Sequence, residues 1–265
     1  MHISLAPEVL FKLGFISVTN SLLSAFVIFA VLVAVLFIFS LSVKAFKASK
    51  TQHLLEYIVF GLIVMLEGIV HTESVKIISF LITFLFFILF SNLFGLLPFI
   101  HSLGFIKTEG VFTSVQNCIK SKDCYFTQSF QVSKAQDFKP LFRAPSSDIS
   151  FTLALALISV MATNILGFKF LGLAYLKKYI NFSSFMAFVV GLMELISEFG
   201  KIISFSFRLF GNIFAGEVLL LVITSITFGL ATLPFFALEV FVSLVQAFVF
   251  FVLTCVFISL AIEKH

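Results

Sequence analysis

LLSAFVIFAVLVAVLFIFSLSV, residues 22–43, contains no charged side chain, and four further runs of at least 20 residues share this property. The others are residues 77–100, 149–168, 218–238 and 240–262. About 20 apolar residues in helical form cross the hydrocarbon core of a bilayer. The runs therefore predict an all-α polytopic membrane protein, built as one membrane domain over residues 1–265.

The composition agrees with this class. Of the 265 residues, 60% are hydrophobic and 11% are charged, and the mean hydropathy is +1.18. The net charge of +4 is modest, and the lysines gather in short connecting segments. This distribution is typical of orientation by positive charge on the inner side of a membrane, and it argues against nucleic-acid binding.

Lysine clusters predict the orientation of the first span. Lys44, Lys47 and Lys50 follow residues 22–43 with no acid among them, which places the N-terminus outside. Residues 1–20 lack a basic region followed by a cleavage site, so no cleaved signal peptide is expected. The segment 52–72 carries charges at both ends of an apolar middle. We expect it to be a helix along the inner surface, with a short span as the alternative.

The middle of the chain is expected to form a transmembrane pair joined by an outer polar loop. Residues 77–100 cross outward, residues 149–168 return inward, and 101–147 form the loop between them. Ser146, Ser147 and Asp148 offer helix N-caps at its end. The basic residues that follow the second span indicate the inner side again: Lys169, Lys177 and Lys178.

Three cysteines divide between the loop and a span. Cys118 and Cys124 lie in the outer loop, where an oxidising space would favour a disulfide between them, with two free thiols as the alternative. Cys255 lies in an apolar run and is expected to be an unpaired apolar filler.

The last third of the chain predicts a hairpin of two long helices, 184–230 and 235–262. The first segment contains no proline. As a continuous helix it would be roughly 70 Å long, far more than the ~30 Å hydrocarbon core. It must bend, tilt steeply or extend past the membrane. Gly229 to Pro234 is expected to form the turn.

Ionisable side chains interrupt this hairpin, although each is unfavourable by about 2.5–3.5 kcal/mol at the centre of a span. The polar residues are Glu194, Glu198, Lys201, Arg208, Asn212, Glu217, Glu239 and Gln246. Such groups face protein or water and mark ion paths; the plainer alternative is ion pairs that only join helices. We prefer that alternative for Glu198 and Lys201, three positions apart. Arg208 has no acid within four residues, so its partner must come from elsewhere.

Helical geometry sorts these residues into faces. At 100° per residue, Arg208 shares a stripe with small and polar residues, and this stripe could admit a partner helix. Its members are Glu194, Lys201, Ser204, Arg208, Gly211, Asn212 and Ala215. Glu217 falls about 180° away, toward the protein interior. Glu239, Ser243 and Gln246 form a second stripe on the last helix.

Four motifs in this order resemble subunit a of the F-type rotary ATP synthases. The most specific is SFRLFGNIFAGE at residues 206–217, and LVQAFVFFVLT follows at 244–254. FSNLFGLLP at 90–98 and DISFTLALA at 148–156 are similar to earlier family blocks. Ile202 departs from the family, many of whose members have proline there, and the loop 101–147 is longer than expected.

The resemblance implies roles for individual residues. Arg208 corresponds to the essential arginine that faces a ring of c subunits, with Asn212 and Gln246 as its polar neighbours. Glu217 and Glu239 correspond to an outer aqueous half-channel, and Glu194 to an inner one. The hairpin would then be steeply tilted along the ring.

The implied function is proton translocation coupled to ring rotation and ATP synthesis, by a subunit that is not itself catalytic. Expected partners are the c-subunit ring, the peripheral-stalk subunit b, the other ATP synthase subunits and the lipid membrane. No cofactor or metal is expected, and the chain has no glycine-rich phosphate loop. The expected location is a bacterial plasma membrane, with the C-terminus inside; a mitochondrial inner membrane is the alternative. The competing interpretations are a secondary transporter that binds an anion at Arg208 and a purely structural scaffold.

Overall fold

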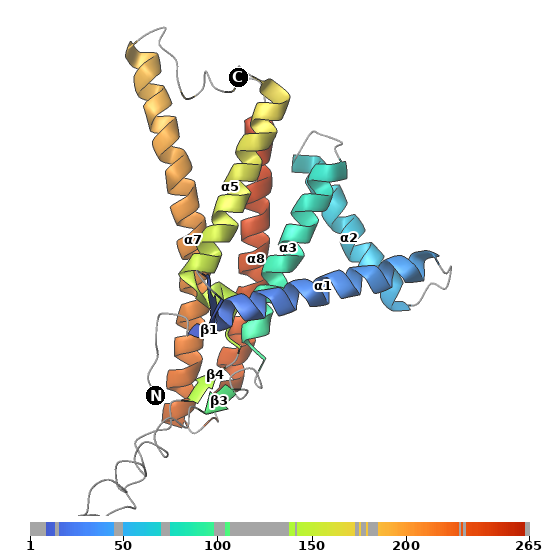
Figure 1. Cartoon of the computed structure of the whole chain (residues 1–265). Coiled ribbons are helices and arrows are strands. Elements are labelled where there is room, and N and C mark those ends of the chain that lie inside the picture. Colours follow the sequence, from blue (N-terminus) through green and yellow to red (C-terminus); the bar gives the residue numbers. More distant parts are fainter. Residues whose placement is uncertain are drawn as a thin grey trace, which may run out of the picture.

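Figure 1 shows the computed structural model of the chain. The residues that it describes are 9–13, 16–44, 50–69, 75–97, 104–106, 138–140, 142–172, 175, 179, 185–227, 229 and 232–262. Six α-helices dominate these residues: α1 Asn20–Lys44, α2 Lys50–Ile69, α3 Val75–Gly95, α5 Ile149–Leu171, α7 Phe185–Thr227 and α8 Thr232–Ile262. The predicted all-α class is confirmed.

Five of these helices are long and apolar enough to cross a membrane: α1, α3, α5, α7 and α8. In α2 the polar start and the acids Glu56 and Glu67 interrupt the apolar pattern, and this helix is not among the five. Its placement along the inner surface stays a prediction.

The helix ends follow local chemistry. Asp148 caps α5, because its carboxylate accepts a hydrogen bond from the Ser150 N–H at 3.0 Å. At the other end Gly172 adopts φ 60°, a backbone conformation that favours glycine, and its N–H donates to the Phe168 carbonyl at 2.8 Å. The prediction of an N-cap among residues 146–148 is therefore confirmed at Asp148.

Two predicted boundaries differ from the structure. α3 ends at Gly95 rather than near residue 100, since Pro98 disfavours helical geometry in the residue before it. α8 begins at Thr232 and includes Pro234, whereas the sequence suggested that this proline belonged to the turn. Proline is tolerated there because the first turn of a helix does not use its N–H groups.

The longest helix, α7, is continuous over 43 residues, roughly 65 Å. The chain turns at Gly229, whose φ of 88° suits glycine, and α8 runs back along α7 (Figure 1). The predicted hairpin of two long helices is thus present.

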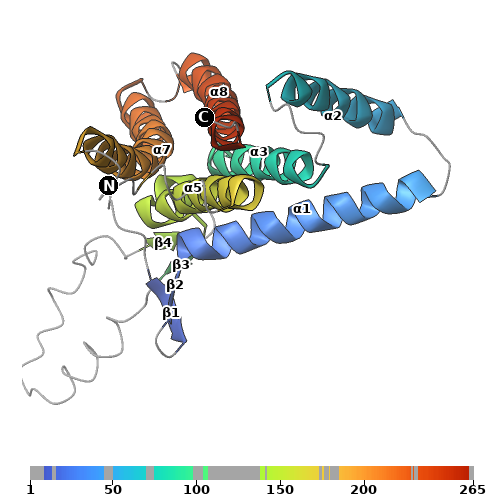
Figure 2. The ribbon, with the colours of Figure 1, turned by 90° about the horizontal axis from the view of Figure 1, so that it is seen from above.

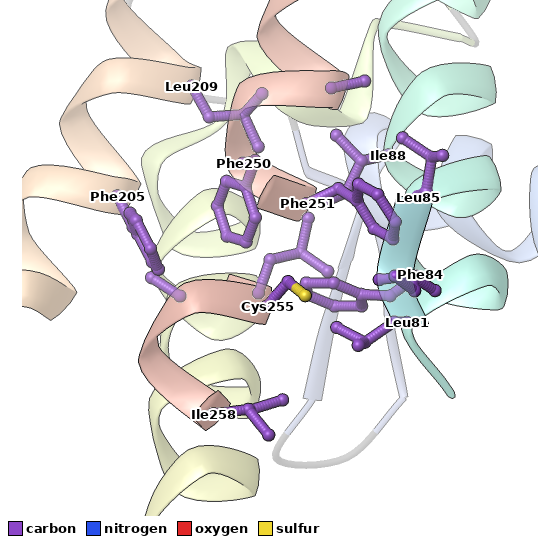
Figure 3. Packing of buried hydrophobic residues seen from close by; sticks show 14 of the residues in the cluster. Leu81, Phe84, Leu85, Ile88, Phe205, Leu209, Phe250, Phe251, Cys255 and Ile258 are labelled. Atoms are coloured by element: carbon purple, nitrogen blue, oxygen red, sulfur yellow. The ribbon is translucent and has the colours of Figure 1, made fainter. Parts of the chain in front are cut away.

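The core lies where α3, α5, α7 and α8 meet. Figure 3 shows Phe250 of α8 between Phe205 of α7 and the side chains of α3. The Phe205 and Phe250 ring centroids are 4.6 Å apart, and those of Phe84 and Phe250 are 5.5 Å apart. Cys255 is fully buried in this cluster as a free thiol, in agreement with the filler predicted for it.

Buried hydroxyl groups also join the helices. Ser159 of α5 and Thr254 of α8 are hydrogen-bonded at 2.8 Å, and Thr152 of α5 and Ser206 of α7 at 3.2 Å. In a membrane such bonds contribute about 0.6 kcal/mol each on average. Their main effect is to fix how the helices are rotated against one another.

α1 runs across the direction of α7 and α8 in Figure 1, and in Figure 2 it extends away from these two helices. Its start is buried, with Asn20 and Ser24 almost fully covered, whereas Phe26 and Phe37 are 66% and 64% exposed. An exposed apolar helix surface of this kind can face lipid, because a helix satisfies its own backbone hydrogen bonds.

Short strands and a 3-10 turn accompany the helices. β1 Val9–Leu13 pairs antiparallel with β2 Ile16–Thr19, and β3 Gly104–Ile106 pairs with β4 Phe138–Pro140. The turn η2, Pro145–Ser147, is buried and contacts α1, α3, α5 and α7. The expected polar loop 101–147 therefore ends in a segment packed among helices, since its small side chains fit between them.

Candidate functional site

Arg208 lies near the middle of α7 on the face directed away from the core. Its side chain is exposed, whereas the neighbouring side chains Phe205 and Leu209 are buried. The guanidinium donates to the Ser204 hydroxyl at 3.3 Å and stands 6.0 Å from the Phe205 ring. Within the described part of the chain no ion pair joins Arg208 to an acid. The helix thus presents a permanent charge outward.

One helical turn further on, α7 and α8 are connected by polar side chains. The Asn212 amide donates to the Gln246 side-chain carbonyl at 3.4 Å. Gln246 and Ser243 are buried, and the Gln246 amide nitrogen and the Ser243 hydroxyl have no hydrogen-bond partner in the described structure. Buried polar groups of this kind normally bind water. The second stripe predicted on α8 therefore faces the interior.

The two acids predicted for the outer half-channel, Glu217 and Glu239, lie close together. Glu239 is 4% exposed, and its carboxylate occupies the space where a side chain at Gly216 would lie. The neighbouring Glu217 is half-buried and interacts electrostatically with Glu239 across the α7–α8 contact. One Glu217 carboxylate oxygen is buried without a hydrogen-bond partner among the described residues. Close carboxylates favour sharing of a proton.

Two residues of the segment before α5, Arg143 and Ser147, also belong to the surroundings of Glu217. They were not among the residues predicted for the site. The Arg143 charge and the Ser147 hydroxyl both act on the Glu217 carboxylate. The Arg143 Nε donates to the Ser147 hydroxyl at 3.0 Å. Ser146 donates to the Asn92 side-chain carbonyl at 2.7 Å, and Asn92 donates to the Ser243 carbonyl at 3.4 Å. Hydrogen bonds thus connect this segment to α3 and α8.

On the other side of Arg208, α7 carries a second set of charges. Glu198 and Lys201 form an ion pair of 2.6 Å, as predicted, and the Lys201 ammonium lies 4.7 Å from the centre of the Phe257 ring. A pocket of about 460 Å³ extends along α7 from Ser197 and Lys201 to Arg208. It connects the ion pair with the arginine.

Two tyrosines of the α5–α7 connection, Tyr175 and Tyr179, belong to the same part of the molecule as Glu198 and Glu194. The Tyr175 and Tyr179 hydroxyls both donate to the Asn164 side-chain carbonyl, at 2.7 and 3.0 Å. Burial, the hydrogen bond with Tyr175 and the nearby Glu198 and Glu194 all raise the pKa of the Tyr179 phenol. Tyr179 therefore stays protonated and donates to Asn164.

The acids predicted for the two half-channels lie on opposite sides of Arg208 along α7. Glu217 is nine positions beyond the arginine and Glu194 fourteen positions before it, or roughly 14 and 21 Å of helix rise. The structure brings Glu217 together with Glu239, and Asn212 with Gln246. It does not bring Glu194 to either pair. Cys118 and Cys124 lie outside the described residues, so the disulfide between them stays a prediction.

Comparisons with a protein family and with individual proteins point to the same kind of protein. Residues 22–259 match the family described as ATP synthase A chain. Proteins named ATP synthase subunit a are 45% identical in Desulfotalea psychrophila over 129 residues and 37% in Campylobacter fetus subsp. fetus over 130. In Helicobacter hepaticus a protein of this name is 40% identical over 130 residues. The matches cover 47%, 48% and 48% of this chain and 52%, 58% and 58% of the relatives. The chain thus spans about half the length of the relatives it matches.

Proposed function

The chain belongs to the ATP synthase A chain family, and we propose that it translocates protons past a ring of c subunits in an F-type ATP synthase. It provides two offset aqueous half-channels and the arginine between them. It is not itself catalytic, and it works in a complex with the ring, the peripheral-stalk subunit b and the other ATP synthase subunits. The complex lies in a bacterial plasma membrane, with the N-terminus of the chain outside and the C-terminus inside.

The observation that carries the proposal is the position of Arg208. A charged side chain in mid-span normally faces the interior of a bundle or a water-filled cavity. Arg208 instead faces outward, and it pairs with no acid in the described part of the chain. An outward charge in a membrane is stabilised by an anionic partner on a neighbouring molecule. A ring carboxylate is the partner that the family supplies.

The proposed path begins at the outer acids. A proton enters past Glu217 and Glu239 and reaches an ionised carboxylate on the ring. Once neutral, that carboxyl can rotate through lipid, because it no longer carries the charge that hydrocarbon excludes. After nearly a full turn it meets water near Glu194 and releases the proton inside.

Arg208 separates the two half-channels. Its pKa above 12 keeps the guanidinium charged in a poor dielectric, so it attracts each ionised ring carboxylate and repels a proton passing directly. The membrane potential drives the transfer with about 2.3 kcal/mol per charge per 100 mV. Asn212 and Gln246 connect the arginine to α8.

An anion transporter has less support. The three relatives described above all carry the name ATP synthase subunit a. Copurification separates the two functions. A ring of small two-helix subunits, each with one acid in mid-membrane, is expected to copurify with the tagged chain in mild detergent. Recovery of a monomeric chain that conducts protons without such a ring would contradict the proposal.

The outer path is tested by thiol labelling. The cysteine in Glu217→Cys or Glu239→Cys is expected to react with small, membrane-impermeant, thiol-reactive compounds added outside, because water must reach both positions. The background is the variant in which Cys118, Cys124 and Cys255 are replaced by serine or alanine. Ile213→Cys is the matched control, since Ile213 is buried on the same helix. Protection of both acid positions, at the level of position 213, would contradict a shared aqueous path.

A further inference from the structure

Arginine is rare in this chain. Of its seventeen lysines and arginines only two are arginines, Arg143 and Arg208. Arginine differs from lysine in its planar fork of donors and in a charge that survives burial. A chain that elsewhere uses lysine therefore uses arginine at the predicted centre of the proton path and at one other place, next to Glu217.

The backbone holds Arg143 in a defined place. Its N–H donates to the Ser24 hydroxyl of α1 at 3.2 Å, and its Nε donates to the Ser147 hydroxyl at 3.0 Å. Ser147 in turn donates to the Ala144 carbonyl at 2.9 Å. Ala144 and Ser147 are fully buried. The side chain thus projects from a segment that is fixed at both ends.

Close packing brings this segment to Glu217. Ala144 fills the space beside Gly95 at the end of α3, so that any side chain at position 95 would overlap it. A Glu217 carboxylate oxygen lies 3.6 Å from the same position. Arg143 attracts the Glu217 carboxylate, and the Ser147 hydroxyl lies beside it. The contact therefore joins the connecting segment to the outer acid of α7.

We propose that Arg143 is a positioning residue of the outer half-channel, which holds the Glu217 carboxylate in place and offsets its repulsion from Glu239. This inference rests on the proposed function. Two charged side chains face Glu217, Arg143 from the connecting segment and Glu239 from α8. Asp148 is close to Arg143 in sequence, but its carboxylate oxygens accept hydrogen bonds from the Ser21 hydroxyl and the Ser150 N–H.

The sign of the effect follows from these charges. With Arg143 present, the ionised form of Glu217 has a cation beside it, so its proton can pass on to the ring. Without Arg143 the ionised Glu217 carboxylate loses the cation that stabilises it, while Glu239 still repels it from α8. Loading from outside then occurs at higher pH, while onward transfer becomes slower.

The experiment is passive proton uptake by vesicles that contain the assembled membrane sector, measured against external pH under a potassium diffusion potential. Arg143→Gln is expected to move the half-maximal pH upward by about one unit and to lower the plateau several-fold. Arg143→Lys keeps the charge and should recover most of the shift. Lys76→Gln, a charge loss at the exposed start of α3, is the matched control and should follow wild type.

A double-variant cycle separates positioning from a structural role. In a Glu217→Gln background, Arg143→Gln should add no further loss of proton uptake to that of Glu217→Gln alone, because its target carboxylate is gone. Copurification of the ring verifies assembly in every variant. An assembled Arg143→Gln complex with the wild-type pH profile would overturn the inference while leaving the proposed function intact. Wild-type vesicles that conduct no protons through this chain would overturn the proposed function itself.

Discussion

Replacement of Arg208 by alanine is expected to abolish ATP synthesis while the chain still folds and binds the ring. The side chain is exposed on α7, and its one hydrogen bond within the described residues is the 3.3 Å contact with the Ser204 hydroxyl. Its removal therefore leaves no buried partner unsatisfied. What is lost is the outward charge that is proposed to attract ring carboxylates. Synthesis in membrane vesicles should fall to background.

The proton permeability of the same vesicles should rise, because the proposed barrier between the half-channels would be lost. Arg208→Lys should also work poorly, since lysine lacks the planar fork and can lose its proton in a low dielectric. Ser204→Ala is the matched control on the same face, and it should retain most activity. Near-normal synthesis by an assembled Arg208→Ala complex would falsify the proposed role of this residue.

Gly216→Ala is expected to give the largest effect among uncharged substitutions in α7. A methyl group at position 216 would overlap the Glu239 carboxylate, which is itself buried. Overpacking of this kind costs about 1–3 kcal/mol of stability. Either α8 moves away from α7 or the Glu239 carboxylate leaves its place. In both cases ATP-driven proton pumping should decline at least tenfold, with a lower midpoint of thermal unfolding.

The same helix offers a control for this prediction. An added methyl group at Gly200 meets no atom within 4 Å, so Gly200→Ala should leave the thermal midpoint unchanged or slightly higher. Glu239→Asp combined with Gly216→Ala tests the cause, because the shorter acid frees the space that the methyl group needs. Partial recovery of pumping is expected in the double variant. If Gly216→Ala behaves like Gly200→Ala, the close contact with Glu239 is not required for transport.

Local sequence was sufficient to predict the helices and the outward-facing position of Arg208 on α7. A helix satisfies its own backbone within a few residues, and a bilayer admits few alternatives to it, so a charge-free run determines the element by itself. The Glu198–Lys201 pair was predictable for the same reason, since residues three apart on a helix are neighbours. The placement of Glu239 and Gln246 on one face of α8 also follows from helical spacing.

Contacts between distant segments were decided only by the tertiary structure. Arg143 looked like one of several charges in a polar loop, yet the segment from Ala144 to Asp148 is buried among four helices, and the Arg143 charge acts on the Glu217 carboxylate. Likewise, nothing in the sequence around Gly216 shows that the Glu239 carboxylate fills its empty side-chain position. Both contacts depend on how helices are rotated and spaced against one another. Packing and interhelical hydrogen bonds determine that arrangement, and neither has a signature in a single stretch of sequence.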